Sequence, residues 1–316
     1  MNRIFMVKYP KVCIIILNWN GKELLKDCLS SLFRLTNYPN YNTVVVDNGS
    51  TDGSIEFVKK NFQQVNILAL DKNYGVTKGI NEGIRHALKK YNPQYILLLS
   101  NDTEIIQKDW LTRMVEVAES DDKIGIVGCK LLYPNGRIQH AGVNLSKLIH
   151  RGYNELSDKY NEIEEINAVT GACFLIKKIV LYIIGGLDEV YLFVGEDVDY
   201  CIRAKKFGFK IFYVGNVKLI HKEGTTIKKS NNDYYYFFVI KGIMIVYFRY
   251  FSLLRKMLII IKSFIQAFIS KKNHFAKVSI SNIIINKSVH KRLFYFFKAL
   301  FISLTSCHKF LNSRFY

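Results

Sequence analysis

The architecture of this chain centres on Tyr95-Ile96-Leu97-Leu98-Leu99-Ser100-Asn101-Asp102-Thr103. A short apolar run that ends in polar residues is typical of a fully buried parallel strand. Ligands of open α/β sheets bind just beyond the carboxyl ends of such strands, so Asp102 stands where a metal or phosphate site would be built. The alternative is that Asp102 merely caps a helix that begins near residues 107–111.

The chain has 316 residues, of which 49% are apolar, and this is enough for one large domain or two modest ones. Its six cysteines form no C-x-x-C pair, which disfavours a disulfide framework or a zinc site and fits a reducing cytosol. The apolar run from Val12 to Leu17 is too short for a signal peptide and has no small-residue cleavage site. We therefore expect a cytoplasmic protein in which this run is the first strand.

The net charge of +19 is unevenly distributed. Residues 1–215 hold 27 Lys and Arg against 24 Asp and Glu, a balance of +3. Residues 216–316 hold 18 Lys and Arg against 2 acids, a balance of +16. The sequence thus predicts a near-neutral domain, residues 1–228, followed by a basic tail, residues 229–316. Such a tail suggests an anionic partner, either nucleic acid or an acidic membrane surface.

Strand-like and helix-like segments alternate through the first hundred residues. The expected strands are 12–17, 43–46, 65–70 and 95–99, and the expected helices are 22–34, 55–62 and 75–90. Alternation of this kind is typical of βαβ units. It predicts the α/β fold class, with a mostly parallel central sheet flanked by helices.

Three of the expected strands end in polar clusters, which are Asn18-Trp19-Asn20, Asp47-Asn48 and Ser100-Asn101-Asp102. Clusters at equivalent strand ends would converge on one crevice. The alternative is three unrelated turns. No G-x-x-x-x-G-K-[ST], G-x-G-x-x-G or G-x-S-x-G motif is present, so a nucleotide site here needs another way to hold a diphosphate. A divalent metal, Mg²⁺ or Mn²⁺, bound by Asp102 would serve.

The second half holds further polar candidates. Thr170-Gly171-Ala172-Cys173 is a turn of small residues that leads into a strand, and Glu196-Asp197 begins a helix. The acids either cap that helix or supply a carboxylate general base whose ionised form the helix dipole favours. His221 follows an expected strand, 212–220, and is either structural or a second metal ligand.

These segments, taken together and in this order, resemble the inverting family 2 glycosyltransferases. The resemblance covers about residues 10–225 and is nearest to the rhamnosyltransferase-like enzymes of cell-surface polysaccharide assembly. It rests on Leu17-Asn18-Trp19-Asn20-Gly21, Val46-Asp47-Asn48-Gly49-Ser50-Thr51-Asp52, Asn73-Tyr74-Gly75 with Gly79, Asn81 and Gly83, Leu99-Ser100-Asn101-Asp102, Thr170-Gly171-Ala172-Cys173, Gly195-Glu196-Asp197-Val198-Asp199, and His221 with Gly224.

The resemblance implies a GT-A fold and a nucleotide-diphosphate sugar as donor. It implies that Asp197, paired with Glu196, is the catalytic base, that Asp102 and His221 bind the metal, and that Asp47 contacts the nucleoside. The full set implied to bind the nucleotide sugar is Asn18, Trp19, Asn20, Asp47, Asn48, Asn73, Gly75, Asn101, Asp102, Thr170, Gly171 and Ala172.

The chain departs from the family at the metal motif. Ser100 replaces the first acid of the family's D-x-D, which leaves Asp102 as its one carboxylate. Glu104 stands at D-x-E spacing and is the alternative to His221 as a second ligand.

The sequence of the tail predicts a basic amphipathic helix over residues 241–270, whose polar residues fall within an arc of roughly 140° around the helix axis. These are Lys241, Arg249, Ser252, Arg255, Lys256, Lys262, Ser263, Gln266 and Ser270. No apolar run approaches the ~18 residues of a spanning helix, so we expect the helix to lie on an anionic membrane surface. The alternative is packing on the domain. The apolar face is too wide for a nucleic-acid reader, so we expect no nucleic-acid partner.

The sequence therefore predicts an enzyme that is peripheral on the inner face of the cell membrane. It would transfer sugar to a glycan acceptor, which we expect to be linked to a polyprenyl lipid. Two other classes stay open at this point. A sugar nucleotidyltransferase lacks support because its Gly-rich phosphate loop is absent, and a non-catalytic nucleotide-sugar-binding membrane adaptor would not need Glu196-Asp197.

Overall fold

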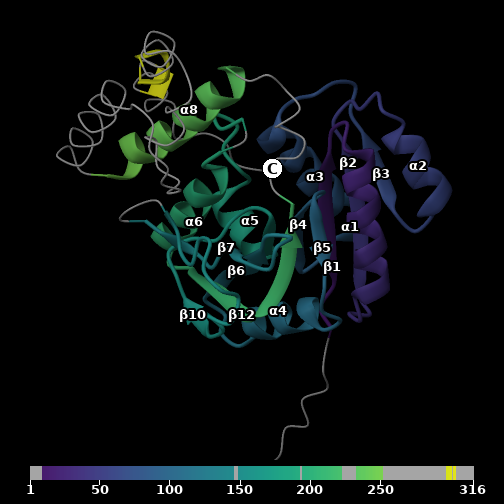
Figure 1. The fold of residues 1–316 in the computed structure, drawn as a ribbon, viewed down its shortest axis with the longest axis horizontal. Helices are drawn as coiled ribbons and strands as arrows, with labels where there is room; N and C mark the ends of the chain where they lie inside the picture. The colour runs from purple at the N-terminus through teal and green to yellow at the C-terminus, as the bar shows by residue number, and fades with distance from the viewer. Residues whose placement is uncertain are drawn as a thin grey trace, which may run out of the picture.

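The structure is a computed structural model that describes residues 9–145, 149–192, 194–222, 233–251, 297–300 and 302–303. Helices cover both faces of a central sheet (Figure 1). The sheet runs in the order β10-β12-β6-β11-β4-β1-β2-β3. Its strands are β1 (Val12–Asn18), β2 (Tyr41–Asp47), β3 (Asn66–Ala69), β4 (Tyr95–Ser100), β6 (Ile124–Leu132), β10 (Ile163–Glu165), β11 (Cys173–Lys177) and β12 (Lys210–His221).

The N-terminal half of the sheet is parallel, as the alternation predicted. β4, β1, β2 and β3 are neighbours and run in one direction, with Leu17 of β1 beside both Val46 and Ser100. The C-terminal half is mixed, because β11 lies antiparallel between β4 and β6 while β12 runs parallel to β6. Two short strands extend the sheet, β5 (Thr103–Ile105) on β12 and β7 (Ile138–His140) on β6. A separate pair is formed by β8 (Val143–Asn144) and β9 (Ile149–His150).

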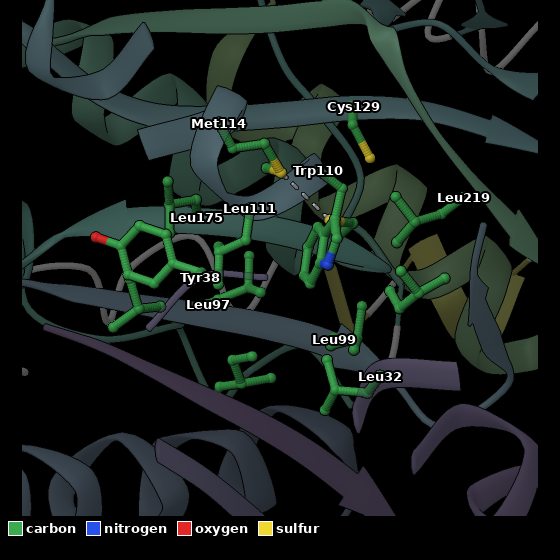
Figure 2. Close-up of a cluster of buried hydrophobic side chains, with 14 of the residues drawn as sticks. Leu32, Tyr38, Leu97, Leu99, Trp110, Leu111, Met114, Cys129, Leu175 and Leu219 are labelled. Carbon is green, nitrogen blue, oxygen red and sulfur yellow. Dashed lines mark hydrogen bonds between the residues drawn. The ribbon is translucent and has the colours of Figure 1, made fainter. Parts of the chain in front are cut away.

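Alternating side chains of the buried strands build a core on each face of the sheet. Val12, Ile14 and Ile16 of β1 point to one face, where they pack against α1 (Lys22–Leu35), α2 (Ser54–Asn61) and α4 (Trp110–Glu119). Figure 2 shows this cluster around the fully buried Trp110, whose indole N–H donates to Thr36 Oγ1 over 3.0 Å. Cys13 and Ile15 point to the other face, so every residue of β1 up to Ile16 is buried.

The opposite face carries α3 (Val76–Tyr91), α5 (Lys178–Ile184) and α6 (Glu196–Lys206). The five cysteines among the described residues are buried and free. α3 lies close against the sheet because its inner face has glycine instead of larger residues. A Cβ added at Gly83 would lie 2.7 Å from Val46 Cγ2 and 2.8 Å from Ile15 Cγ2. The close approach of α3 places its N-terminus beside the carboxyl ends of the parallel strands.

Asp102 does not cap the helix that follows it. β5 comes directly after Asp102, and α4 begins only at Trp110, with Asp109 in the N-cap position. The residues expected to start that helix, 107–109, instead lead into it. The structure therefore removes the capping alternative for Asp102.

The tail is described only in part. α8 (Asp233–Tyr250) begins eight residues before the expected helix, and its side chains Ile245 and Val246 are buried against Tyr191 of the domain. The predicted helix beyond Phe251, with most of its polar arc, lies outside the described residues. Among the helices that the structure describes, none combines the length and apolar character needed to cross a bilayer. The division at residue 228 stays a prediction.

We expect Gly83→Ala to lower the free energy of unfolding by up to about 2 kcal/mol. Alanine favours a helix over glycine by roughly 1 kcal/mol, but overpacking a rigid core costs about 1–3 kcal/mol. Both neighbours, Val46 and Ile15, are β-branched and fully buried, so we expect overpacking to win. Urea denaturation measures the change, with the exposed Lys89→Ala on the same helix as control. A more stable Gly83→Ala variant would show that the contact relaxes.

Candidate functional site

The polar ends of β1, β2 and β4 meet at Asn18, as their sequence pattern predicted. Asn18 is fully buried. Its Nδ2 donates to Asp47 Oδ2 over 3.2 Å, and its Oδ1 accepts from Asn101 Nδ2 over 2.9 Å. One amide side chain thus joins three neighbouring strands, because parallel strands end at the same edge of the sheet.

Asp47 and Asn20 share Ser50, a residue that the sequence reading did not assign to the site. The Ser50 backbone N–H donates to Asp47 Oδ1 over 2.8 Å, while Ser50 Oγ accepts from the Asn20 backbone N–H over 2.9 Å. Asn20 has a φ of +48°, a left-handed conformation that asparagine tolerates. Trp19 beside it is 43% exposed.

Asn48 extends the site towards α3. Its Nδ2 donates to Asn73 Oδ1 over 2.9 Å and to the Gly75 carbonyl over 3.1 Å, and its Oδ1 accepts from the Tyr74 backbone N–H over 2.9 Å. The predicted residues Asn48, Asn73 and Gly75 therefore form one hydrogen-bonded group. This group fixes the loop before α3 against the end of β2.

Asp102 and His221 are in contact. Asp102 Oδ1 lies 3.0 Å from His221 Nε2, and it also accepts from Ser100 Oγ over 2.7 Å. Burial acts to raise the pKa of Asp102, but the hydrogen bond and charge of His221, with the bond from Ser100, lower it below its usual value. The other nitrogen of the imidazole, Nδ1, lies 2.6 Å from Oε1 of the buried Gln139. Gln139 thus orients the ring so that Nε2 faces the carboxylate.

Glu104, the alternative second ligand, is directed elsewhere. Its carboxylate pairs with Lys222, which also pairs with Asp27 over 2.8 Å. Within the described part of the chain no group of three His, Cys, Asp or Glu side chains could hold a metal ion. The pair Asp102 and His221 still fits a metal completed by other oxygens. Two ligands at right angles, each about 2.1 Å from an octahedral cation, lie about 3 Å apart.

A turn of small residues connects the strand ends to the acids of α6. The Ser100 backbone N–H donates to the Ala172 carbonyl over 3.0 Å, and the Gly171 backbone N–H donates to Asp197 Oδ2 over 2.9 Å. The Val198 backbone N–H donates to Asp197 Oδ1 over 2.7 Å. Both carboxylate oxygens are thereby oriented, and each keeps a lone pair for another partner.

Glu196 stands beside Asp197 in a different environment. Its Oε2 is shielded from solvent and has no hydrogen-bond partner among the described residues. Burial, with the negative charge of Asp197, raises the pKa of Glu196 to about 8. At neutral pH Glu196 therefore holds a proton, because burial and the neighbouring negative charge both favour its neutral form.

Besides Ser50, three residues around the site were not assigned to it from the sequence. Gln139 lies on a three-residue strand whose sequence gives no sign of its contact with His221. Asp199, in the first turn of α6, pairs with Arg203 over 2.8 Å. Their i, i+4 spacing on an expected helix could have indicated this ion pair from the sequence.

Comparison with known families places most of the sheet in one of them. The profile described as Glycosyl transferase family 2 matches residues 13–182, a little over half of the chain. The match includes the polar ends of β1, β2 and β4 and the turn at Thr170–Ala172. It ends before Glu196, Asp197 and His221, so the family profile does not include these three residues.

Two known proteins illustrate the range of relatives. The chain is 28% identical over 228 residues to the O-antigen biosynthesis protein RfbC of Myxococcus xanthus, covering 69% of this chain and 18% of that protein. It is 21% identical over 235 residues to an N-acetylglucosaminyl-diphospho-decaprenol L-rhamnosyltransferase of Mycobacterium tuberculosis. This alignment covers 66% of this chain and 75% of that protein. The chain thus spans less than a fifth of the length of the Myxococcus protein.

Among solved structures, the fold is similar to the mannosyltransferase PcManGT of Pyrobaculum calidifontis, solved with GDP-Man and Mn²⁺. The TM-score is 0.56 at 16% identity, and the alignment covers 97% of this chain and 77% of that one. At this identity the likeness shows a shared GT-A-like fold, with a mixed, mostly parallel sheet between helices.

We expect Glu196→Gln to stabilise the protein more at pH 8 than at pH 5. The raised pKa means that the folded state holds this proton more tightly than the unfolded state. Its contribution to stability is therefore full below pH 4.5 and is lost as the pH rises towards 8. Glutamine keeps the neutral form at every pH, so the gain in unfolding free energy at pH 8 over pH 5 should be at least about 1 kcal/mol.

Chemical denaturation at the two pH values measures this difference. The matched control for loss of one negative charge is Glu56→Gln, at an exposed position on α2. An equal effect of Glu196→Gln at both pH values would mean that Glu196 is ionised in the folded protein.

Proposed function

This chain belongs to glycosyl transferase family 2, and we therefore propose that it transfers a sugar from a nucleotide-diphosphate sugar to a hydroxyl group of a glycan. The observation that carries the proposal is the pair of hydrogen bonds from Ser100 to Ala172 and from Gly171 to Asp197. They hold an oriented carboxylate beside the carboxyl ends of the strands, where α/β sheets bind nucleotides.

In this proposal the donor lies along the ends of β1, β2 and β4. Asp47, kept in place by Asn18 and Ser50, accepts hydrogen bonds from the nucleoside. Trp19 offers an exposed aromatic face at the rim. Asn48, Asn73 and Gly75 close the side next to α3, and Thr170–Ala172 form the floor between donor and acceptor.

The proposed reaction is a single displacement with inversion. Asp197 takes the proton of the acceptor hydroxyl while that oxygen attacks the anomeric carbon from the face opposite the diphosphate. The new carbon–oxygen bond forms as the bond to the diphosphate oxygen breaks, and the nucleoside diphosphate leaves with that electron pair. The two backbone N–H donors aim the Asp197 carboxylate, and the protonated Glu196 avoids a second negative charge beside it.

We assign Asp102 and His221 as the protein ligands of a divalent metal, Mg²⁺ or Mn²⁺. Their 3.0 Å separation suits two adjacent positions of an octahedral site, and Gln139 fixes the imidazole. When bound, such an ion neutralises negative charge on the departing diphosphate. The mannosyltransferase of similar fold was solved with Mn²⁺, which supports the choice of a divalent metal.

A lipid-linked glycan is the acceptor that we propose, in the synthesis of a cell-surface polysaccharide. The Mycobacterium relative is named for transfer to an N-acetylglucosaminyl-diphospho-decaprenol, and the Myxococcus relative is named for O-antigen biosynthesis. A basic tail that binds an anionic membrane surface would bring the enzyme to such a substrate. The enzyme would then act at the inner face of the cell membrane.

Asp197→Asn should reduce sugar transfer at least about 10³-fold, since the amide cannot accept the hydroxyl proton. Donor binding should stay within about twofold, because Asn keeps the shape of the side chain. Transfer is followed as radiolabelled sugar entering an N-acetylglucosaminyl-diphospho-polyprenol, and donor binding by calorimetry. Asp109→Asn, at the start of α4, is the matched control. Transfer by Asp197→Asn at the wild-type rate would exclude Asp197 as the base.

Asp102→Asn and His221→Ala should each weaken Mn²⁺-dependent donor binding by about tenfold or more. The measurement is a thermal-shift panel of UDP-GlcNAc, GDP-mannose and dTDP-rhamnose, each with Mn²⁺ and with chelator. We expect a metal-dependent shift with one donor, and Glu104→Gln is the control that keeps it. A shift that survives chelator would exclude metal-assisted donor binding. Absence of any shift would contradict the proposed donor class.

A further inference from the structure

The loop between α5 and α6 joins the donor side of the site to the acids of α6. We call its described residues, 185–192 with 194–195, the α6 loop. The Val76 backbone N–H at the start of α3 donates to the Leu192 carbonyl over 2.8 Å, and Thr77 Oγ1 donates to the Tyr191 carbonyl. Buried Asn81 of α3 donates to the Leu187 carbonyl and accepts from its N–H. One side of the α6 loop is thus attached to α3.

The other side of the α6 loop is covered by α8, a helix outside the family match. Gly242 lies so close to Val194 that a Cβ there would collide with its carbonyl. A Cβ at Gly195 would in turn lie 3.2 Å from the Gly242 carbonyl oxygen. Lys241 Nζ donates to the Val190 carbonyl over 3.1 Å. The backbone of α8 therefore packs directly on the residues that precede Glu196.

A buried charge network fastens α8 to both the α6 loop and α6. Asp199, in the first turn of α6, is fully buried. It accepts from Arg203 Nε over 2.8 Å, from Tyr191 OH over 3.1 Å and from Tyr250 OH over 2.6 Å. Arg249 Nη1 of α8 lies 3.3 Å from Asp199 and 2.8 Å from Asp188.

Arg249 has only 6% of its side chain exposed, so these ion pairs are shielded from water. Removal of Arg249 takes the arginine partner from Asp188 and leaves Asp199 with Arg203. Acids that lose a counter-charge in a buried network draw in water or shift position. Asp188 lies in the α6 loop and Asp199 lies two residues after Asp197. Any such shift therefore acts on the segment that carries the proposed base.

We propose that Arg249 is a positioning residue for the reaction. By bridging Asp188 and Asp199, it fixes the first turn of α6 and so aims the Asp197 carboxylate, without touching the substrates. This inference rests on the function proposed above. It makes α8, at the head of the basic tail, a structural part of the catalytic centre.

The test compares Arg249→Met and Arg249→Lys with wild type in the full chain. Steady-state release of nucleoside diphosphate is measured with UDP-GlcNAc, GDP-mannose and dTDP-rhamnose. Misplacement of a catalytic group by about 1 Å costs as much as 10²-fold. We therefore expect Arg249→Met to lower kcat by about tenfold or more, with the donor KM within about twofold. Lysine keeps the charge but not the planar fork, so Arg249→Lys should be intermediate.

Hydrogen exchange of the amides from 196 to 200 supplies a readout that needs no activity. We expect faster exchange there in Arg249→Met, with exchange in β1 unchanged. The matched control is Arg113→Met, which removes an Arg–Asp pair from the surface of α4 and should alter neither kcat nor this exchange. If Arg249→Met does not fold, Arg249→Lys carries the same comparison.

The outcomes separate the two proposals. Unchanged exchange, or an unchanged kcat in a variant with faster exchange, overturns the positioning role. A parallel rise in donor KM also overturns it, because the defect then extends to the donor site. If no nucleotide sugar is turned over by wild type, the proposed function fails. Faster exchange in Arg249→Met then shows only that the residue holds α6, and its role in catalysis falls with that function.

Discussion

The antiparallel pairing of β11 with β4 is the contact on which the rest of the site depends. In this register Cys173 faces Leu99, and the Ser100 N–H reaches the Ala172 carbonyl. The turn before β11 is thereby placed at the polar end of β4, where Gly171 can donate to Asp197. A slip of one residue would turn the side chains of β11 to the wrong faces, and Cys173 and Phe174 would exchange cores. Two buried cores therefore enforce the register that assembles the site.

The acids of α6 are supported from two directions. α3 holds the α6 loop from the donor side through Asn81 and Thr77, and α8 holds it from the opposite side through Gly242 and Arg249. The contacts between α8 and the domain also change how we interpret the basic residues of this helix. Lys241 and Arg249 belong to the polar arc that we expected to face lipid headgroups, yet both bind the domain. For these two residues packing on the domain, the alternative left open by the sequence, describes the structure.

Much of the N-terminal half was predictable because its signals are local. The buried runs of β1, β2 and β4 and the spacing of apolar residues in α1 and α3 gave the elements, and alternation gave the parallel order. Convergence of Asn18, Asp47 and Asn101 followed from that order. The second half was less predictable, because no pattern of side chains in the sequence shows that β11 lies antiparallel between β4 and β6. The contact of Gln139 with His221, 82 residues apart, likewise has no local signature.

The amino-acid order was sufficient for the fold class, the polar strand ends and the membership of the family, because side-chain periodicity and short motifs are properties of neighbouring residues. Which charged side chains pair with one another was decided only by the tertiary structure. Asp102 contacts His221 while Glu104 pairs with Lys222, and Arg249 joins Asp188 to Asp199. Such choices depend on which charged groups are buried together at distances of about 3 Å. That proximity comes from the packing of distant segments, since an unpaired charge in the interior is too costly to persist.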